Sequence, residues 1–363
     1  MKKYNASNER VKRQYLSFLK EAKRQSEATI DGVSKAFARF EEHTNFRDFK
    51  RFRREQAISF KRHLAEARSC STGGKLSKST LHATLAHLKR FFEWLAMQPG
   101  YKSRVQYTDA EYFNLSDNDA RIATARRERP YPTLEQVKST LAGMPKNSET
   151  ENRNRAVMAF ALLTGARDSA IASAKLKHID MDRRLFYQDA REVKTKFRKS
   201  FPTYFFPVGD EVFEVLQLWL TYLRREKLYG DEDPIFPTTN IVVNEEQRFE
   251  AAGIGREHWK NTSPIRKIFR EAFEVAGLPY FHPHSIRRTL VNFGSKVCQT
   301  PQEFKAWSQN LGHEAVLTTF DSYGYVNERD QREIILRLEP GRSDQESEVE
   351  RIAEAVVRRL NRE

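Results

Sequence analysis

The chain has 363 residues, of which 39% are hydrophobic, and this length and composition favour two domains with buried cores. Its formal net charge of +14 favours a polyanionic partner, most simply nucleic acid, and no apolar run is long enough to cross a membrane. The two cysteines, Cys70 and Cys298, lie far apart, and the N-terminal MKKYNASNER lacks the apolar run of a signal peptide. These features argue against a disulfide-stapled secreted fold and a membrane protein, and we expect a cytoplasmic location.

Residues 1–122 are predicted to form a helical domain. One amphipathic helix is marked by apolar residues at three- and four-residue steps, namely Leu81, Leu85, Leu88, Phe92 and Leu95. Gly73-Gly74 precede this helix and Pro99-Gly100 end it, and the segment 8–43 predicts one or two further helices. Such apolar stripes usually pack in a core, so a binding function would lie on the opposite, basic faces.

Basic residues gather in short clusters, as they do in proteins that contact a phosphate backbone. One cluster lies near residue 50, a second near residue 127 and a third over residues 194–199. The second falls in the polar segment 123–132, which ends in Pro-Tyr-Pro and is predicted to be an interdomain linker. The residues that we predict to contact DNA are Lys50, Arg51, Arg53, Arg54, Arg126, Arg127, Arg129 and Lys196.

Residues 133–340 are predicted to form a second domain. Thr133 and Gln136 make a capping-box pattern, so a helix is expected to begin there. Another helix is expected over residues 153–163, ended by Gly165, with Arg167 at or just before the start of the next one.

The middle of this second domain changes character. Aromatic runs at 185–187 and 204–206 flank a charged segment, which predicts a β-hairpin. A helix is expected over residues 210–229, followed by an irregular segment over 231–262, because prolines and glycines recur there. From residue 264 onward helices are expected again.

A phosphodiester can be cut without a metal if cations hold its oxygens, a nucleophile attacks in line and an acid protonates the leaving oxygen. Arg287 lies three residues after His284, so one helix face would present both side chains to one phosphate. Pro283 is expected at the first helical position, which would place His284 in the first turn, where free backbone N–H groups favour an anion.

Three other positions could complete such a site. A capping box at residues 300–303 begins a helix that Gly312 ends, so His313 would be presented just past the helix end. Tyr323 could attack a phosphate if nearby cations favour its phenolate or a base takes its proton. Lys194 is two residues from Lys196 in the expected hairpin, and either could protonate a leaving oxygen, because alternate residues of a strand share a face.

Taken singly, each of these residues has a plainer explanation as a capping histidine, a packing tyrosine or a solvated lysine at a hairpin tip. A metal site made of His282, His284 and His313 is disfavoured, because no carboxylate or cysteine accompanies them in a metal-binding pattern. We therefore expect no metal ion at these histidines.

Taken together, TGAR at 164–167, the lysine of VKTK, HSIR, LGH and the tyrosine of SYG resemble the tyrosine recombinase, or phage integrase, family. The resemblance is specific from residue 131 to residue 331 and general before that. It implies an α+β protein, mainly helical with a small antiparallel sheet, in which a core-binding domain and a catalytic domain form a C-shaped clamp on double-stranded DNA. It also implies a site-specific recombinase that works as a homo-tetramer on two DNA sites, with accessory DNA-bending or directionality proteins as potential partners.

The resemblance carries the family's catalytic pattern onto Arg167, Lys194, His284, Arg287, His313 and Tyr323. In this pattern Lys194 is the general acid toward the 5′-oxygen, and Tyr323 forms a 3′-phosphotyrosine link. The resemblance also implies that the reaction needs neither a metal nor any other cofactor. This sequence departs from the pattern at Ala170, where the family usually has an acidic residue that Asp168 could replace, and at Arg288, where it often has histidine. The gap between His313 and Tyr323 is one residue longer than is common, which leaves Tyr325 as a weaker rival.

Two other functions stay open at this point. The same site could nick and close DNA alone, as in type IB topoisomerases or hairpin-forming strand transferases, or the fold could serve a non-catalytic DNA-binding factor. The segment 341–363 is expected to be a C-terminal helix, and its apolar stripe favours docking onto a neighbouring protomer over folding back: Val349, Ile352, Val356 and Leu360.

Overall fold

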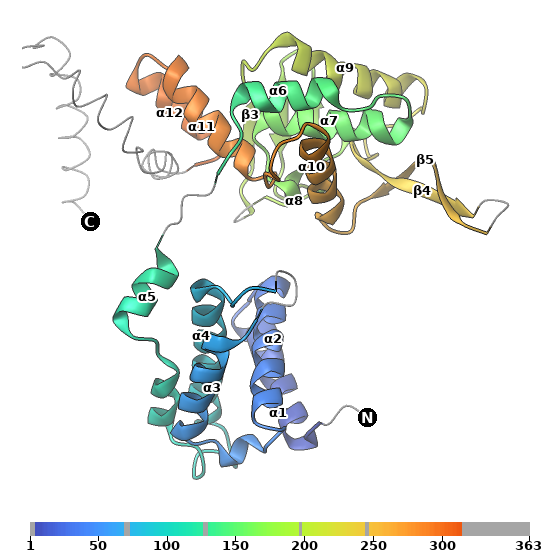
Figure 1. The fold of residues 1–363 in the computed structure, drawn as a ribbon. Coiled ribbons are helices and arrows are strands. Elements are labelled where there is room, and N and C mark those ends of the chain that lie inside the picture. Colours follow the sequence, from blue (N-terminus) through green and yellow to red (C-terminus); the bar gives the residue numbers. More distant parts are fainter. Residues whose placement is uncertain (1–3, 69–72, 126–129, 196–197, 244–246, 314–363) are drawn as a thin grey trace, which may run out of the picture. The chain divides into compact units, whose positions relative to one another are not determined.

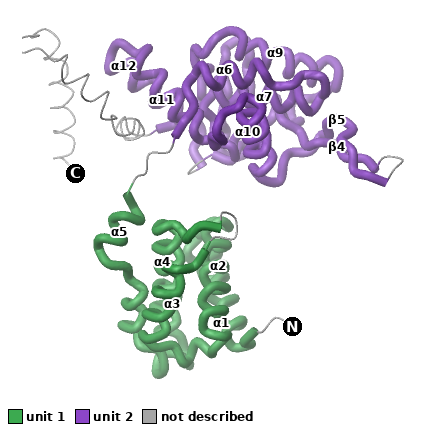
Figure 2. The backbone as a smooth tube through the Cα atoms, in the orientation of Figure 1, with its two compact units in different colours: residues 1–127 green, residues 128–363 purple. Residues whose placement is uncertain are grey.

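The computed structural model describes residues 4–68, 73–125, 130–195, 198–243 and 247–313. The chain divides into two compact units, Met1–Arg127 and Glu128–Glu363, which Figure 2 shows in green and purple. Each unit has its own hydrophobic core, as expected of a domain. The division falls inside the segment 123–132.

Unit 1 is helical, as the sequence predicted (Figure 1). Asn5, Ser26, Ser77 and Ser116 each begin a helix by accepting a backbone N–H from within its first turn. The elements are α1 (Ala6–Ser17), the π-helical turn η1 (Phe18–Ala22), α2 (Glu27–His43), η2 (Phe49–Arg51), α3 (Arg54–Glu66), α4 (Lys78–Leu95), η3 (Tyr107–Phe113) and α5 (Asp117–Thr124).

Aromatic rings fill the core of unit 1. Phe52 stacks on Phe92 with 3.7 Å between ring centroids, and Phe40 meets five other rings, three of them edge to face within 6 Å. Phe49 and Phe52 are fully buried, and they anchor the segment that carries the first basic cluster. The burial of each ring stabilises the fold by about 1.5–3 kcal/mol, so this segment is held firmly.

Unit 2 combines helices with two small antiparallel sheets (Figure 1). Its helices are α6 (Leu134–Gly143), α7 (Glu149–Thr164), α8 (Asp168–Ser173), η4 (Leu176–His178), α9 (Asp210–Arg225), α10 (Ser263–Val275), α11 (Ser285–Val297) and α12 (Pro301–Asn310). Its strands are β1 (Ile179–Asp180), β2 (Leu185–Gln188), β3 (Phe201–Tyr204), β4 (Pro237–Val243) and β5 (Phe249–His258). The predicted fold class is therefore confirmed.

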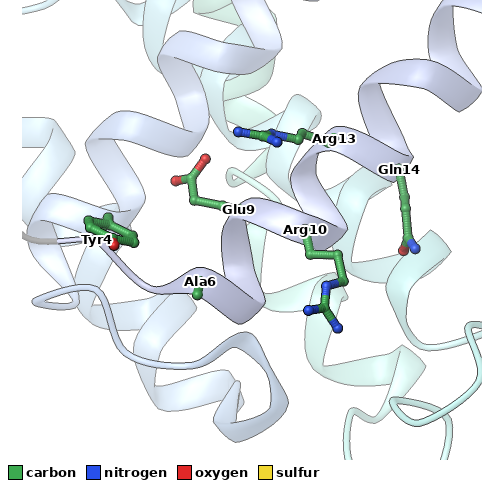
Figure 3. Close-up of a pocket in the computed structure, with 6 residues that line it drawn as sticks. All are labelled: Tyr4, Ala6, Glu9, Arg10, Arg13 and Gln14. Carbon is green, nitrogen blue, oxygen red and sulfur yellow. The ribbon is translucent and has the colours of Figure 1, made fainter.

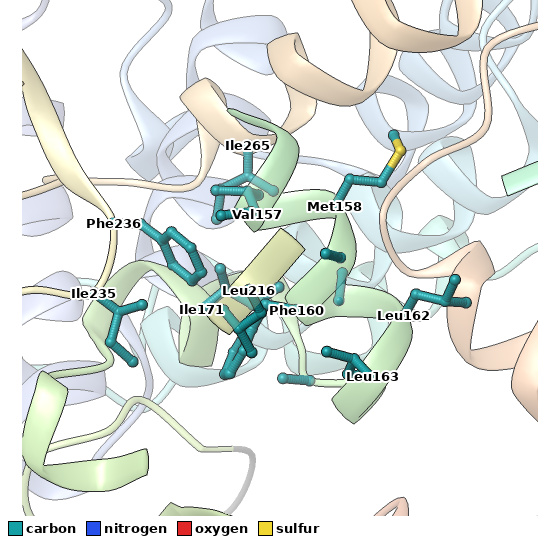
Figure 4. Close-up of a cluster of buried hydrophobic side chains, with 14 of the residues drawn as sticks. Val157, Met158, Phe160, Leu162, Leu163, Ile171, Leu216, Ile235, Phe236 and Ile265 are labelled. Atoms are coloured by element: carbon teal, nitrogen blue, oxygen red, sulfur yellow. The ribbon is translucent and has the colours of Figure 1, made fainter. Parts of the chain in front are cut away.

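Helix α7 forms the centre of the unit 2 core. Every residue from Ala156 to Thr164 is buried, because the helix is apolar on all sides over this stretch. Figure 4 shows Val157, Phe160 and Leu163 of α7 among side chains from neighbouring segments. The C-terminal end of this buried helix leads directly into the TGAR segment, so the site is attached to the core of the unit.

The segment 231–262 is not irregular, and that expectation was wrong. Strands β4 and β5 pair antiparallel, with Ile241 opposite Ala251 and Val243 opposite Phe249. The prolines and glycines of this segment do not prevent strand formation. Pro237 stands at the first position of β4, where a missing N–H is tolerated. Gly253 has a left-handed φ of 100° and lies near register shifts in the ladder. The β-branched run of β4 was the better signal.

Two charged residues of α7, the buried Arg153 and the half-buried Glu149, fasten this hairpin. Arg153 donates from Nη1 to the carbonyl of Pro237 at 2.9 Å and to Oγ1 of Thr239 at 3.0 Å, and its guanidinium lies 5.2 Å from the Trp259 ring centroid. Glu149 accepts from the Tyr222 hydroxyl, from Lys227 Nζ at 2.9 Å and from the backbone N–H of Ile254 at 3.0 Å. The base of the hairpin is thus fixed to the central helix.

Among the described helices, none combines the length and the apolar character that crossing a bilayer requires.

Candidate active site

Arg287 is the centre of the candidate site. It lies on α11 and is buried, and its Nη1 donates to the carbonyl of Gly165 at 2.5 Å. Its Nη2 donates to the carbonyl of Leu311 at 2.5 Å and lies 3.0 Å from Nε2 of His313. Burial lowers the pKa of Arg287, and the charge of Arg167 lowers it further. The structure therefore joins three of the predicted motifs, TGAR, HSIR and LGH, at one guanidinium.

The TGAR segment is shaped by its glycine. Gly165 ends α7 with a φ of 58°, a left-handed conformation that costs a residue with a Cβ roughly 1–2 kcal/mol. A Cβ here would also lie 2.7 Å from Cδ2 of Leu311, so only glycine lets the end of α12 approach. The Thr164 hydroxyl accepts the N–H of Ala166 at 3.1 Å and so completes the turn. The turn aims the Gly165 carbonyl at Arg287.

The LGH segment is a Schellman helix end, with Gly312 at the left-handed position. Its φ is 68°, its N–H donates to Gln309 O at 2.7 Å, and the N–H of His313 donates to Ser308 O at 3.2 Å. A Cβ on Gly312 would lie 2.5 Å from the Phe201 ring. This motif places the His313 ring beside Arg287, and it confirms the predicted helix that Thr300 and Glu303 begin with a capping box.

Arg167 stands at the N-cap of α8, as predicted, and is part-buried. Its guanidinium has no hydrogen-bond or ion-pair partner within the described residues, and burial lowers its pKa. No carboxylate contacts Arg167 or Arg287 in this part of the chain. Two enclosed cations without a counter-ion are costly, so the site is suited to bind an anion.

His284 lies beside this pair. Its pKa is lowered to about 4, first by desolvation of the partly enclosed ring and then by the charges of Arg287 and Arg167, although more than a third of the residue remains open to solvent. The ring is therefore neutral near pH 7. It can donate a hydrogen bond to a phosphate or accept a proton, but it adds no charge.

The expected start of α11 needs correction. The helix begins at Ser285, so His284 is its N-cap and Pro283 precedes it. The N–H of His284 donates to His282 Nδ1 at 3.1 Å, and the N–H groups of the next three residues also have partners within the turn. The predicted anion site of free backbone N–H groups is therefore absent from this turn, because local bonds occupy them.

Lys194 lies in the segment between β2 and β3, not on a strand, so the argument that Lys194 and Lys196 share a strand face was wrong. The Lys194 N–H donates to Ser173 Oγ at 2.8 Å, and the Lys194 carbonyl accepts from Ser169 Oγ at 3.0 Å. Both serines belong to α8, so the Lys194 backbone is fixed to the helix that Arg167 begins. Lys196 lies outside the described residues.

This chain has Ala170 at the position where the family usually has an acidic residue. Ala170 is buried, and Asp168 accepts from Nη2 of Arg266 on α10 at 3.2 Å. Asp168 therefore ties α8 to α10. No hydrogen bond joins it to Arg167 or Arg287 within the described residues.

Two buried hydroxyls adjoin the predicted site, and we did not single them out from the sequence. The Oγ of Ser285 and the Oγ1 of Thr195 have no hydrogen-bond partner in the described part of the chain. Ser285 follows His284, and Thr195 follows Lys194, so a hydroxyl within each motif was the available signal. Buried hydroxyls of this kind are available to a bound ligand.

The predicted DNA contacts of unit 1 differ in their surroundings. Arg53 donates from Nη1 to the carbonyls of Phe52 and Arg104, and Arg54 pairs with Glu55. Arg51 is exposed and has no partner within the described residues. Lys50 lies 5.5 Å from the centroid of the Tyr101 ring.

Other predicted residues cannot be placed. Tyr323, Tyr325, Arg126, Arg127, Arg129 and the segment 341–363 lie outside the described residues. A pocket near the start of α1 is lined by Tyr4, Glu9, Arg10 and Arg13 among others (Figure 3), and none of the predicted site residues lines it.

Comparison with known proteins decides the family, because residues 133–330 match the phage integrase family. The chain belongs to this family. Phage integrase family members of the tyrosine recombinase type are site-specific recombinases, which break and rejoin DNA, so the predicted enzyme class is confirmed. The nick-and-close and non-catalytic alternatives gain no support from these matches.

Other proteins of this family align with most of the chain. Tyrosine recombinase XerC of Lactobacillus delbrueckii subsp. bulgaricus is 23% identical over 317 residues, which cover 85% of this chain and 92% of that protein. Tyrosine recombinase XerC of Bacillus licheniformis is 22% identical over 84% of this chain and 88% of its own length.

Two solved structures share the fold. A lambda integrase dimer bound to a COC′ core site matches 88% of this chain and 96% of its own chain with a TM-score of 0.59 and 13% identity. The XerH site-specific recombinase bound to a palindromic difH substrate matches 89% of this chain and 83% of its own, with a TM-score of 0.54 and 16% identity.

Proposed function

We propose that this recombinase binds duplex DNA and holds one scissile phosphate at Arg167, Arg287, His284 and His313 while Tyr323 attacks it. The observation that supports this most strongly is the pair of enclosed guanidinium groups, one of which has no partner within the described residues. A phosphate supplies the negative charge that this pair lacks, and a planar guanidinium binds two of its oxygens at once.

The roles follow from the chemistry of each group. Arg167 and Arg287 stabilise the charge of the non-bridging oxygens in the transition state. The Nη2 of Arg287 can only donate, so His313 accepts through Nε2 and its neutral ring carries the proton on Nδ1. Tyr323 forms a 3′-phosphotyrosine link, Lys194 gives a proton to the 5′-oxygen, and a neutral imidazole is available to take the phenol proton.

A nicked suicide substrate that carries the recombination site tests the nucleophile. After cleavage a short 3′ fragment diffuses away from such a DNA, and the covalent adduct accumulates. We expect Tyr323→Phe to form no adduct and Tyr325→Phe to form it as the unaltered protein does. An adduct on Tyr323→Phe would show that another residue attacks.

We also propose that four copies act on two DNA duplexes, with the segment 341–363 of one copy docking onto the next. An apolar groove lies between residues 204–207, the end of α11 and α12, and is lined by Phe206, Pro207, Val297 and Trp307 among others. It supports this assembly, because the apolar stripe predicted for 341–363 would be covered there. Two differently labelled duplexes provide the test. Recombination yields joined products that carry both labels, whereas nicking and closing alone returns each duplex unchanged.

A further inference from the structure

The hydrogen-bond partner of His258 determines which of its ring nitrogens carries a proton. It is the last residue of β5 and is half-buried, and its Nδ1 lies 3.3 Å from the carbonyl of Ala172. A carbonyl oxygen can only accept, so the Nδ1 of His258 carries a proton. In the neutral ring Nε2 then holds a lone pair, and Nε2 has no hydrogen-bond partner among the described residues.

The ring is tied to the same short helix as Lys194. Ala172 lies on α8 between Ser169 and Ser173, whose hydroxyls hold the carbonyl and the N–H of Lys194 at 3.0 Å and 2.8 Å. Helix α8 therefore carries Arg167 at its N-cap and fixes both His258 and the Lys194 backbone through neighbouring residues. The hairpin that ends in His258 is itself anchored, because the next residue, Trp259, packs on Arg153.

The charged groups that act on His258 are Lys175, Lys194 and Asp233. Burial is the main cause that lowers the pKa of His258; the two lysines lower it further, and the Ala172 carbonyl and Asp233 oppose them. The Lys175 ammonium forms an ion pair with Glu232 at 2.7 Å. The Lys194 ammonium has no hydrogen-bond or ion-pair partner in the described part of the chain, so it is the cation near His258 that can accept a new partner.

We propose that His258 is a positioning residue for the general acid: its Nε2 lone pair accepts one N–H of the Lys194 ammonium in the DNA complex and thereby aims another N–H at the 5′-oxygen. An ammonium on a flexible four-carbon stem can adopt many directions, and one fixed acceptor removes most of them. The inference rests on the role of Lys194 in the proposed function.

The chemical step balances without further reactants. The bond between the Tyr323 oxygen and phosphorus forms as the bond between phosphorus and the 5′-oxygen breaks. The phenol proton of Tyr323 passes to a neutral imidazole of the site, as in the proposed function. A second proton passes from the Lys194 ammonium to the 5′-oxygen, which leaves a neutral amine. His258 stays neutral throughout, and religation returns both protons along the same paths.

A sulfur substitution isolates this role. In a suicide substrate with a 5′-bridging phosphorothiolate the leaving thiolate departs without a proton, so general-acid defects disappear while structural defects remain. We expect His258→Leu, which lacks an acceptor, to slow single-turnover cleavage of the oxygen substrate on the order of 10- to 100-fold. The sulfur substrate should restore its rate to within a few-fold of the unaltered protein, on the same principle.

Matched variants separate the outcomes. His258→Gln keeps an acceptor and should lose much less, and Glu257→Gln introduces the same side chain one position earlier, at an exposed residue, and should cleave both substrates normally. If His258→Leu stays slow on sulfur while Lys194→Ala is rescued, His258 is only structural and the proposal is wrong. If Lys194→Ala is not rescued, the general-acid assignment itself fails and the role of His258 falls with it.

The pH profile gives a second readout that a structural role would not change. Protonation of Nε2 removes the lone pair, so cleavage of the oxygen substrate should fall on the acid side, below the ordinary histidine pKa of about 6.5. We expect His258→Gln to lack this part of the fall. Identical pH profiles for the unaltered protein and for His258→Gln would contradict the proposal.

Discussion

The Nη2 atom of Arg287 lies 3.0 Å from Nε2 of His313, although 26 residues separate the two in the sequence. The same Nη2 donates to the carbonyl of Leu311, and Nη1 donates to the carbonyl of Gly165. The direction of this guanidinium is therefore set by the ends of α7 and α12. A phosphate would meet a cation whose orientation is settled before DNA binds, which lowers the cost of reaching the transition state.

Arg287→Lys should slow covalent cleavage on the order of 100-fold, because a single ammonium cannot reach both carbonyls and His313 at once. Single-turnover adduct formation on the suicide substrate measures this loss. Arg288→Lys is the matched control, since that guanidinium lies 5.0 Å from the Tyr131 ring centroid and the substitution keeps its charge. Equal losses in the two variants would show that the orientation of Arg287 is unimportant.

Gly312→Ala should destabilise unit 2 by more than Gly277→Ala does. The two glycines have almost the same φ, 68° and 67°, so the conformational penalty of roughly 1–2 kcal/mol is shared. A Cβ on Gly312 also lies 2.5 Å from the Phe201 ring, whereas nothing lies within 4 Å of one on Gly277. Urea unfolding of both variants gives the difference, and equal stabilities would mean that Phe201 moves aside at no cost.

Glu149→Gln should weaken the acid dependence of unit 2 stability. Desolvation raises the pKa of Glu149, but hydrogen bonds from Tyr222, Lys227 and the Ile254 N–H together lower it below 4.5. A carboxyl with a depressed folded pKa stabilises the fold above its unfolded pKa, and this contribution is lost as the pH falls through the folded value. Thermal unfolding between pH 7 and pH 3 should therefore show a smaller decline for Glu149→Gln, and parallel curves would contradict it.

DNA binding should weaken steeply with salt, because lysines and arginines that contact phosphates release counter-ions. In the basic cluster near residue 50, Arg51 is exposed and has no partner among the residues that the structure describes, whereas Arg53 donates to backbone carbonyls. Arg51→Ala should lower the slope of log affinity against log salt concentration by about one without loss of stability. Fluorescence titrations at several salt concentrations measure the slope, and an affinity that is flat with salt would refute the predicted contacts.

The sequence predicted the parts of the site that rest on local rules. Gly165 and Gly312 end helices, and Thr133 and Thr300 begin them, because caps depend on residues only a few positions apart. The pairing of β4 with β5 was missed, since the prolines and glycines were given more weight than the β-branched run of β4, and the contacts of Arg153 that fix the hairpin to α7 are long-range. The hairpin of β2 and β3 that flanks Lys194 was predicted correctly, but the path of Lys194 between them was not, because serines of α8 determine it.

The Leu311 carbonyl that holds Arg287 comes from the far end of α12, 24 residues later in the chain. A polypeptide still on the ribosome, with α12 inside the exit tunnel, has no means of closing this arrangement. Its first arginine and its HxxR pair are already synthesised, yet the guanidinium that they need is unsupported. A nascent chain therefore lacks the oriented guanidinium of this site until α12 has left the ribosome and folded against α11.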